Sequence, residues 1–104
     1  MELDEFLEVS LLLDYYKNLL SDKQKEYMLE HFEKDLSLSE IAKNHSVSRQ
    51  AVYDNIRRGM KILREYERKI GFCQREREFM DSLEELRKDF TLTKLDEIKD
   101  RLES

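Results

Sequence analysis

The near absence of helix-breaking residues constrains this chain more than any other feature of its sequence. Its 104 residues include no proline and two glycines, Gly59 and Gly71. Charged residues make up 41% of the chain, and the strong helix formers glutamate, lysine, leucine and arginine are abundant. Strong helix formers with almost no breakers predict an all-α fold.

Capping residues predict where the helices begin. Residues 21–24 and 37–40 both fit the capping box, in which a Ser hydroxyl accepts from the third amide of the helix and Glu or Gln reaches back. Ser48 is a third predicted cap, and Thr91 or Thr93 a fourth. The apolar spacing between these caps predicts helices at residues 3–19, 22–33, 38–45, 49–70, 73–89 and 92–102.

Residues 37–56, SLSEIAKNHSVSRQAVYDNI, carry the pattern of a helix-turn-helix motif. Ala42 is small where the second helix would cross the first, and Val47 would fill the angle between them. Val52 and Ile56 lie one turn apart on the buried face of the second helix. The pattern predicts two consecutive helices joined by a short turn, one at residues 38–45 and one that begins at residue 49.

The turn of this motif departs from the usual pattern at Ser46. Such turns usually place glycine there, because the backbone tends to adopt positive φ. A serine in that conformation costs about 1 kcal/mol. We therefore expect a looser or differently shaped turn, with the motif itself retained.

The second helix of the motif presents polar and basic side chains opposite its apolar stripe. In the major groove, residues at the start of such a helix contact base edges, and those that follow contact phosphates. On this basis Arg49, Gln50 and Tyr53 are predicted to contact bases, and Arg57 and Lys61 the backbone. The predicted nucleic-acid-binding residues are Ser48, Arg49, Gln50, Tyr53, Asn55, Arg57, Arg58 and Lys61.

Acidic residues support a second interpretation of the same helix. Asp54 interrupts the proposed surface, and a line of cations continues through Lys61, Arg64 and Arg68, all within reach of Glu65 and Glu67. Part of this line could therefore be an ordinary salt-bridged, solvated face. The net charge is -5, residues 1–35 hold four basic against ten acidic residues, and an acidic first helix nearby would repel phosphate.

The two ends of the chain carry more apolar surface than a single surface helix needs. Between Phe6 and Leu20 apolar residues cover more than one face. A heptad-like seam runs from Phe79 to Phe90 through Leu83 and Leu86, and Leu95, Ile98 and Leu102 extend it. Either the C-terminal helices fold back onto the first helix, or the chain forms a homodimer through Phe6–Leu20 and Phe79–Phe90.

Several classes of function find little support in the sequence. His31 and His45 stand apart from any catalytic arrangement; we expect His45 to be exposed and His31 to lie on a polar face, and we predict no enzyme activity. The single Cys73 permits no internal disulfide and no metal ligand set, and no cofactor is predicted. Charges interrupt the stretch from Phe6 to Leu20, so we expect neither a membrane span nor a signal peptide, and a cytoplasmic location.

The block LSLSEIAKNHSVSRQAVYDNIRR, with LLDYYKNLLSDKQKEYMLEHFEKD before it and ILREYERKIG after it, resembles the bacterial YlxM/p13-like helix-turn-helix family (UPF0122). The domain of that family is similar to region 4 of sigma factors. The resemblance covers roughly residues 11–71. It implies a small bacterial protein encoded beside signal recognition particle GTPase genes, with a regulatory part in that pathway. It places recognition positions at Arg49, Gln50, Tyr53, Asp54 and Asn55.

These observations together predict a helix-turn-helix domain at residues 1–71, including an N-terminal helix, and a C-terminal helical extension at residues 72–104. The extension is expected to pack on the first helix or in a dimer. The favoured function is a DNA-binding regulator with a part in the signal recognition particle pathway. The alternative is an accessory that binds the particle's protein or RNA without binding DNA.

Overall fold

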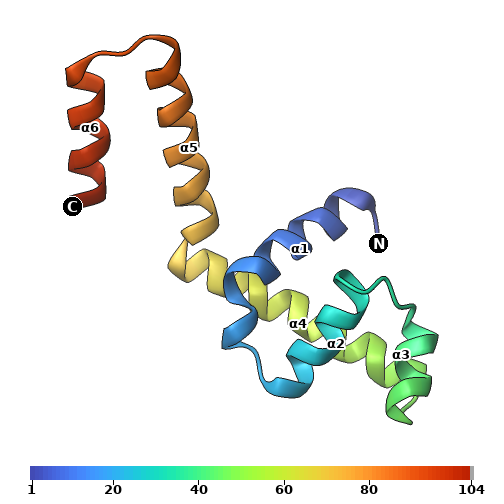
Figure 1. The fold of residues 1–104 in the computed structure, drawn as a ribbon. Coiled ribbons are helices and arrows are strands. Elements are labelled where there is room, and N and C mark those ends of the chain that lie inside the picture. Colours follow the sequence, from blue (N-terminus) through green and yellow to red (C-terminus); the bar gives the residue numbers. More distant parts are fainter. Residues whose placement is uncertain (104) are drawn as a thin grey trace. The chain divides into compact units, whose positions relative to one another are not determined.

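The computed structural model describes residues 1–103, and within that range it contains helices and no strand (Figure 1). The predicted all-α fold is confirmed. The first predicted helix is shorter than expected, because it ends at Tyr16 and a 3-10 turn follows. The elements are α1 (Leu3–Tyr16), η1 (Lys17–Leu19), α2 (Asp22–Phe32), α3 (Leu38–His45), α4 (Arg49–Ile70), α5 (Phe72–Lys88) and α6 (Leu92–Glu103).

The chain divides into two compact units. Helices α1 to α4 form the first unit, Met1–Gly71, and α5 with α6 forms the second, which begins at Phe72. The idea that the second unit packs on the first helix or in a dimer stays a prediction. Among the described residues, no helix combines the length and the apolar character that crossing a membrane would require.

Helix α4 is the central element of the first unit, because α1, α2 and α3 all pack against it (Figure 1). Its buried residues recur every third or fourth position, so one stripe of α4 faces the core. That stripe consists of Val52, Ile56, Met60 and Leu63, with Gly59 beside it. The other helices and their connections contribute the buried apolar residues Val9, Leu12, Leu13, Tyr16, Leu20, Tyr27, Met28, Phe32, Ile41 and Ala42.

Gly59 allows α2 to lie very close to α4. A Cβ atom at this position would lie 2.7 Å from Sδ of Met28 and 3.0 Å from Nε2 of Gln24. Gln24 is buried, and its side-chain amide donates to the backbone carbonyl of Asn55 and, at 2.6 Å, to Oδ1 of Asn55. A glycine inside a helix costs about 1 kcal/mol relative to alanine. The close packing and the satisfied buried amide offset that cost.

The structure confirms one predicted capping box and half of the other. Oγ of Ser37 accepts from the Glu40 amide, and the Glu40 carboxylate accepts from the Ser37 amide, both at 3.1 Å. The hydrogen bond from the Ser37 backbone lowers the pKa of Glu40. At the start of α2, Ser21 accepts from the Gln24 amide at 3.3 Å. The Gln24 side chain, however, turns to Asn55 and not back to Ser21, because burial against α4 provides it with two acceptors.

The turn between α3 and α4 keeps the geometry in which glycine is usual. Ser46 has φ 54° and ψ 43°, in the left-handed region. Its N–H donates to the carbonyl of Lys43, and the N–H of Val47 donates to that of Ala42 at 3.0 Å. These two bonds form the Schellman arrangement that ends many helices. The expected looser turn is therefore wrong, since the closing hydrogen bonds hold serine in a strained conformation.

The second unit is a pair of helices. Oγ1 of Thr91 accepts from the Lys94 amide at 3.1 Å, so Thr91 and not Thr93 caps α6. Ile98 is buried, whereas Phe90, at the end of the predicted seam, is 62% exposed. Cys73 is buried as well. The hairpin therefore covers one part of its apolar surface and exposes another.

Replacing Ser46 with glycine should stabilise the protein. The Ser46→Gly change removes the steric strain that a side chain causes in the left-handed conformation, and it should raise the free energy of unfolding by about 1 kcal/mol. Chemical denaturation of the full chain measures this. The matched control is Lys43→Gly, which places glycine at an exposed position inside α3 and should lower stability by roughly 0.5–1 kcal/mol. A destabilising effect of Ser46→Gly would contradict the strain assigned to this turn.

Candidate nucleic-acid interface

Ser48 sets the start of α4 and so determines where the following side chains lie. It has extended backbone angles, and its Oγ accepts from the Ala51 amide at 3.0 Å. Arg49, Gln50 and Tyr53 follow on the first turns, and all three are exposed. The hydroxyl proton of Ser48 is not used by the cap and can still be donated to an anion.

Gln50 and Asp54 form an exposed pair one turn apart. Nε2 of Gln50 donates to Oδ1 of Asp54 at 2.9 Å. The pair fixes the orientation of the amide and leaves its second N–H and its oxygen for a base edge, which is the combination that suits adenine. The Asp54 carboxylate would repel a nearby phosphate, so this part of the surface suits bases better than backbone.

Tyr53 and Arg57 also lie one turn apart and interact with each other. The guanidinium of Arg57 lies 5.8 Å from the centroid of the Tyr53 ring, within cation–π range. Tyr53 is 40% exposed, so part of the ring still faces solvent. The two side chains together offer a positive charge and an aromatic surface to a ligand.

Arg57, Arg58 and Lys61 continue the surface along α4 as exposed cations. None of the three forms an ion pair with another residue in the range 1–103. They line an open groove of about 550 Å³ between α4 and the start of α1. Its full lining is Glu5, Arg57, Arg58, Met60, Lys61, Arg64, Glu65 and Arg68. We call Arg57, Arg58 and Lys61 the open cations.

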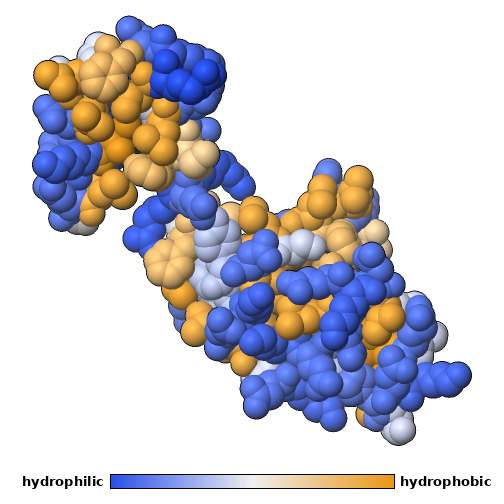
Figure 2. Space-filling model, viewed as in Figure 1, coloured by the Kyte–Doolittle hydropathy of each residue, from blue (hydrophilic) through white to orange (hydrophobic). Residues whose placement is uncertain are grey.

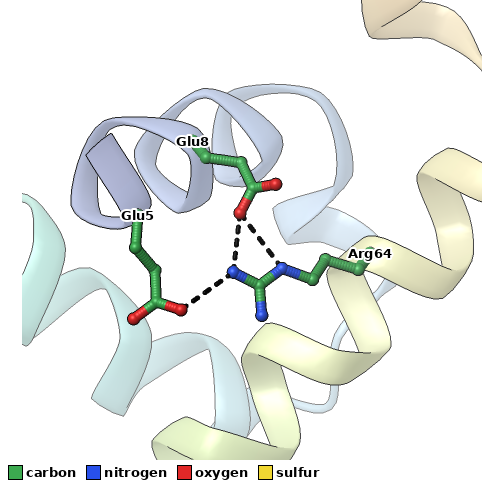
Figure 3. Close-up of polar contacts among 3 residues, drawn as sticks. All are labelled: Glu5, Glu8 and Arg64. Atoms are coloured by element: carbon green, nitrogen blue, oxygen red, sulfur yellow. Dashed lines mark hydrogen bonds and ion pairs between the residues drawn. The ribbon is translucent and has the colours of Figure 1, made fainter. Parts of the chain in front are cut away.

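Beyond the open cations, Arg64 is held by two carboxylates of α1 (Figure 3). Its Nε and Nη2 donate to Oε1 of Glu8 at 3.1 and 2.6 Å, and its Nη2 donates to Oε2 of Glu5 at 3.2 Å. The hydrogen bonds to Glu8 are the main reason that the pKa of Arg64 is raised. Two negative charges therefore match this one positive charge, and Arg64 is not free to neutralise a phosphate.

The line of cations that the sequence predicts along α4 therefore falls into an open part and a part held in ion pairs. Arg68 pairs with Glu65, and Lys69 pairs with the same carboxylate at 3.6 Å. Glu67 accepts a hydrogen bond from Tyr16 of α1. The interpretation of an ordinary salt-bridged face is thus correct for Arg68, which pairs with Glu65 as expected, while Arg64 pairs with α1 and Lys61 has no ion-pair partner among the described residues.

Asn55 lies on a different side of α4 from the other predicted contact residues. It is half-buried, and its side chain and backbone oxygens accept from Gln24 of α2. The prediction that Asn55 contacts nucleic acid is therefore corrected, because its carboxamide oxygen already accepts a hydrogen bond inside the domain. No local sequence pattern predicts this contact, because Gln24 lies 31 residues away in the chain.

The two histidines also differ in part from expectation. His45 was predicted to be exposed, but 16% of its side chain is accessible and its Nε2 lies 2.8 Å from Oε2 of Glu30. Nδ1 of His31 lies 2.9 Å from the carbonyl of Leu36, and its ring packs against aromatic rings. The prediction for His45 is wrong, because α2 packs against the end of α3 and brings Glu30 beside the ring. His31 has a polar partner, as expected, but its ring also packs against Phe6 of α1.

The clamp on Arg64 should be measurable as a coupling between two helices. In a double-mutant cycle with Arg64→Met and Glu8→Gln, we expect a coupling free energy of roughly 0.5–1 kcal/mol, because the pair is partly exposed. Chemical denaturation of the four proteins measures it. The control cycle combines Arg64→Met with Asp14→Asn, a change at another exposed carboxylate of α1, and should show no coupling. Equal values in the two cycles would contradict the contact.

Comparisons with known proteins identify a helix-turn-helix family. The family described as "Putative helix-turn-helix protein, YlxM / p13 like" matches residues 3–102. The UPF0122 protein FN1394 of Fusobacterium nucleatum is 54% identical over 102 residues, which are 98% of this chain and 99% of that protein.

Two further relatives come from other bacteria. The UPF0122 protein ABC2295 of Shouchella clausii is 48% identical over 86 residues, covering 83% of this chain and 79% of that protein. The UPF0122 protein YlxM of Bacillus subtilis is 43% identical over 89 residues, covering 83% of this chain and 81% of that protein. The similarity therefore extends over the helix-turn-helix motif and over the helices on both sides of it.

Proposed function

We propose that this chain, which belongs to the YlxM/p13-like helix-turn-helix family, binds double-stranded DNA through the first half of α4. One observation carries the proposal. Val52 and Ile56 are buried, while Arg49, Gln50 and Tyr53 on the same turns are exposed and take no part in the core. A helix that is anchored on one side and polar on the other can enter a major groove. An all-helical fold of this family is not typically enzymatic, so we propose binding and not catalysis.

The side chains at the start of α4 suit different parts of a duplex. Arg49 suits the acceptor pair of guanine, and Gln50 suits the donor and acceptor of adenine. Ser48 and the first amides of α4 suit a phosphate, since the positive end of the helix dipole lies there. Tyr53 can contact a base or a phosphate. The open cations then follow the DNA backbone.

The acidic α1 limits how much DNA this surface can hold. Glu5 and Glu8 neutralise Arg64, so phosphate contacts end near Lys61. With the three open cations as the phosphate contacts, the logarithm of the binding constant should fall with the logarithm of salt concentration with a slope of roughly -3. Binding is therefore expected to be moderate in strength and to depend on base contacts for selectivity.

Substitutions at the start of α4 test the proposal most sharply. Arg49→Ala and Gln50→Ala should each weaken binding to a duplex selected from random sequence by roughly 1–3 kcal/mol, with relaxed preference at one base position. Arg57→Ala should weaken binding to all sequences and reduce the salt slope by about 0.9. Fluorescence anisotropy over a range of salt concentrations measures all three.

The matched control is Arg77→Ala, which removes the same charge from an exposed position on α5. It should leave the affinity and the salt slope nearly unchanged. A protein that binds no duplex at low salt, or that responds equally to Arg77→Ala and Arg49→Ala, would rule out the proposed surface.

A second candidate ligand is the RNA of the signal recognition particle, and the observation that favours it is the Tyr53–Arg57 pair. Unpaired bases stack on aromatic rings and guanidinium groups, which such a pair presents together. A protein of the particle is the third candidate ligand. All three ligands would place the chain in the bacterial cytoplasm. Competition between structured RNA and duplex DNA for the labelled protein separates the first two, and a pull-down with the particle tests the third.

Self-association through α1 and the C-terminal hairpin is the final element of the proposal. Leu3, Leu7 and Leu11 form an exposed line on α1, opposite its buried residues. Apolar side chains also gather over the α5–α6 hairpin (Figure 2), where Phe90 and Leu92 are strongly exposed. A dimer could present two copies of α4 to two half-sites. We propose that Phe6–Leu20 and Phe79–Phe90 supply its contacts.

Sedimentation of the full chain tests this dimer. Wild-type protein should sediment as a dimer, and Phe90→Ser should shift it toward the monomer because an apolar contact is lost. The control is Ile62→Ser, an exposed apolar position on α4 outside both segments. A monomeric wild-type protein, or equal effects of the two substitutions, would count against association through these surfaces.

A further inference from the structure

We propose that Glu26, Glu30 and His45 form a binding site for a first-row divalent metal ion, with Zn²⁺ as the best fit. The two glutamates lie one turn apart on α2, and His45 is the last residue of α3. One potential ligand atom from each of the three residues lies within 4.8 Å of the others. The site is separate from the nucleic-acid surface and does not depend on DNA binding.

The distances among the three ligand atoms suit a small cation. Nε2 of His45 lies 2.8 Å from Oε2 of Glu30 and 3.9 Å from Oε1 of Glu26. Tetrahedral Zn²⁺ with bonds of about 2.0–2.2 Å requires separations of roughly 3.3 Å between its ligand atoms. The two separations from the imidazole lie on either side of that value, and no pair among the three ligand atoms is more than 4.8 Å apart. Small rotations of the side chains would therefore bring all three atoms to bonding distance of one ion.

The charges of the cluster also point to a cation. The Glu30 side chain is 13% exposed, and a carboxylate this far from water requires a positive partner. Within residues 1–103, neither glutamate has a Lys or Arg partner, and the imidazole is the group that faces both. A neutral imidazole leaves two negative charges one turn apart. A divalent ion would neutralise both.

The set of donor atoms favours zinc and related ions over magnesium and calcium. Imidazole nitrogen with two carboxylate oxygens suits Zn²⁺, whereas Mg²⁺ and Ca²⁺ prefer oxygen alone. The Tyr27 ring packs edge-on against the imidazole, with centroids 4.7 Å apart, and so restrains the orientation of its nitrogen. Glu26 is 56% exposed, which leaves an open side for a water molecule as the fourth ligand.

Such an ion would link the end of α3, the first helix of the helix-turn-helix motif, to α2. His45 directly precedes Ser46, the left-handed residue of the turn. A bond from the ion to His45 and bonds to the glutamates would fix the end of α3 against α2. The angle at which α4 leaves the turn would then be more tightly restrained with metal than without it.

Isothermal titration of the full chain with ZnCl₂ tests the site. We expect one ion per chain and no comparable binding of MgCl₂. Glu26→Gln should weaken Zn²⁺ binding by roughly 10- to 100-fold or more, since even loss of an outer partner of a metal ligand has that effect. Glu26 is exposed and 3.9 Å from the imidazole, so its substitution should leave the fold intact, which circular dichroism checks.

Controls separate this site from incidental binding. Glu33→Gln removes an exposed carboxylate just after α2 and should leave Zn²⁺ affinity unchanged. With Co²⁺ as a probe, ligands of nitrogen and oxygen should give visible d–d bands without the thiolate band that the Cys73 thiol would produce. Absence of Zn²⁺ binding would show that the cluster is a hydrogen-bonded brace, and equal affinity of Glu26→Gln and wild type would place the ion elsewhere. Either result overturns the proposal.

Discussion

Burial of the apolar stripe of α4 determines which side chains of this protein meet solvent. Val52, Ile56, Met60 and Leu63 face the core, where α1, α2 and α3 pack on the same helix. At roughly 1.5–3 kcal/mol for a fully buried apolar side chain, this stripe outweighs any single polar contact in the unit. Rotating α4 about its axis would expose this apolar stripe to solvent. The orientation of the polar side of α4, and with it the proposed DNA surface, follows from this one constraint.

The helices that cover this stripe also shape the charge on its other side. Helix α1 brings Glu5 and Glu8 to Arg64, and so closes the basic surface after Lys61. Helix α2 brings Gln24 to Asn55 and removes that side chain from the surface. The result is a short exposed region with the proposed base contacts first and unpaired cations next. An acidic chain can in this way keep one limited area suited to nucleic acid.

Features that depend on neighbouring residues could be predicted from the sequence. The Ser37–Glu40 box and the Ser48 cap involve partners three residues apart, and the stripe of α4 follows from helical periodicity. Contacts between distant residues could not be predicted, because no local pattern encodes them. Arg64 finds Glu8 at a separation of 56 residues. His45 and Glu30 illustrate the same limit, since the carboxylate beside the imidazole lies on another helix, 15 residues away in sequence.

NMR titration of the isotope-labelled full chain with duplex DNA at low salt tests the central claim most directly, because it maps the bound surface residue by residue. The largest shift changes should fall on the amides of residues 49–61. Arg64 and Arg68, whose charges are already paired, should change little. Largest changes along α1 or in the α5–α6 hairpin, or no changes at all, would contradict the assignment of the first half of α4 as the nucleic-acid surface.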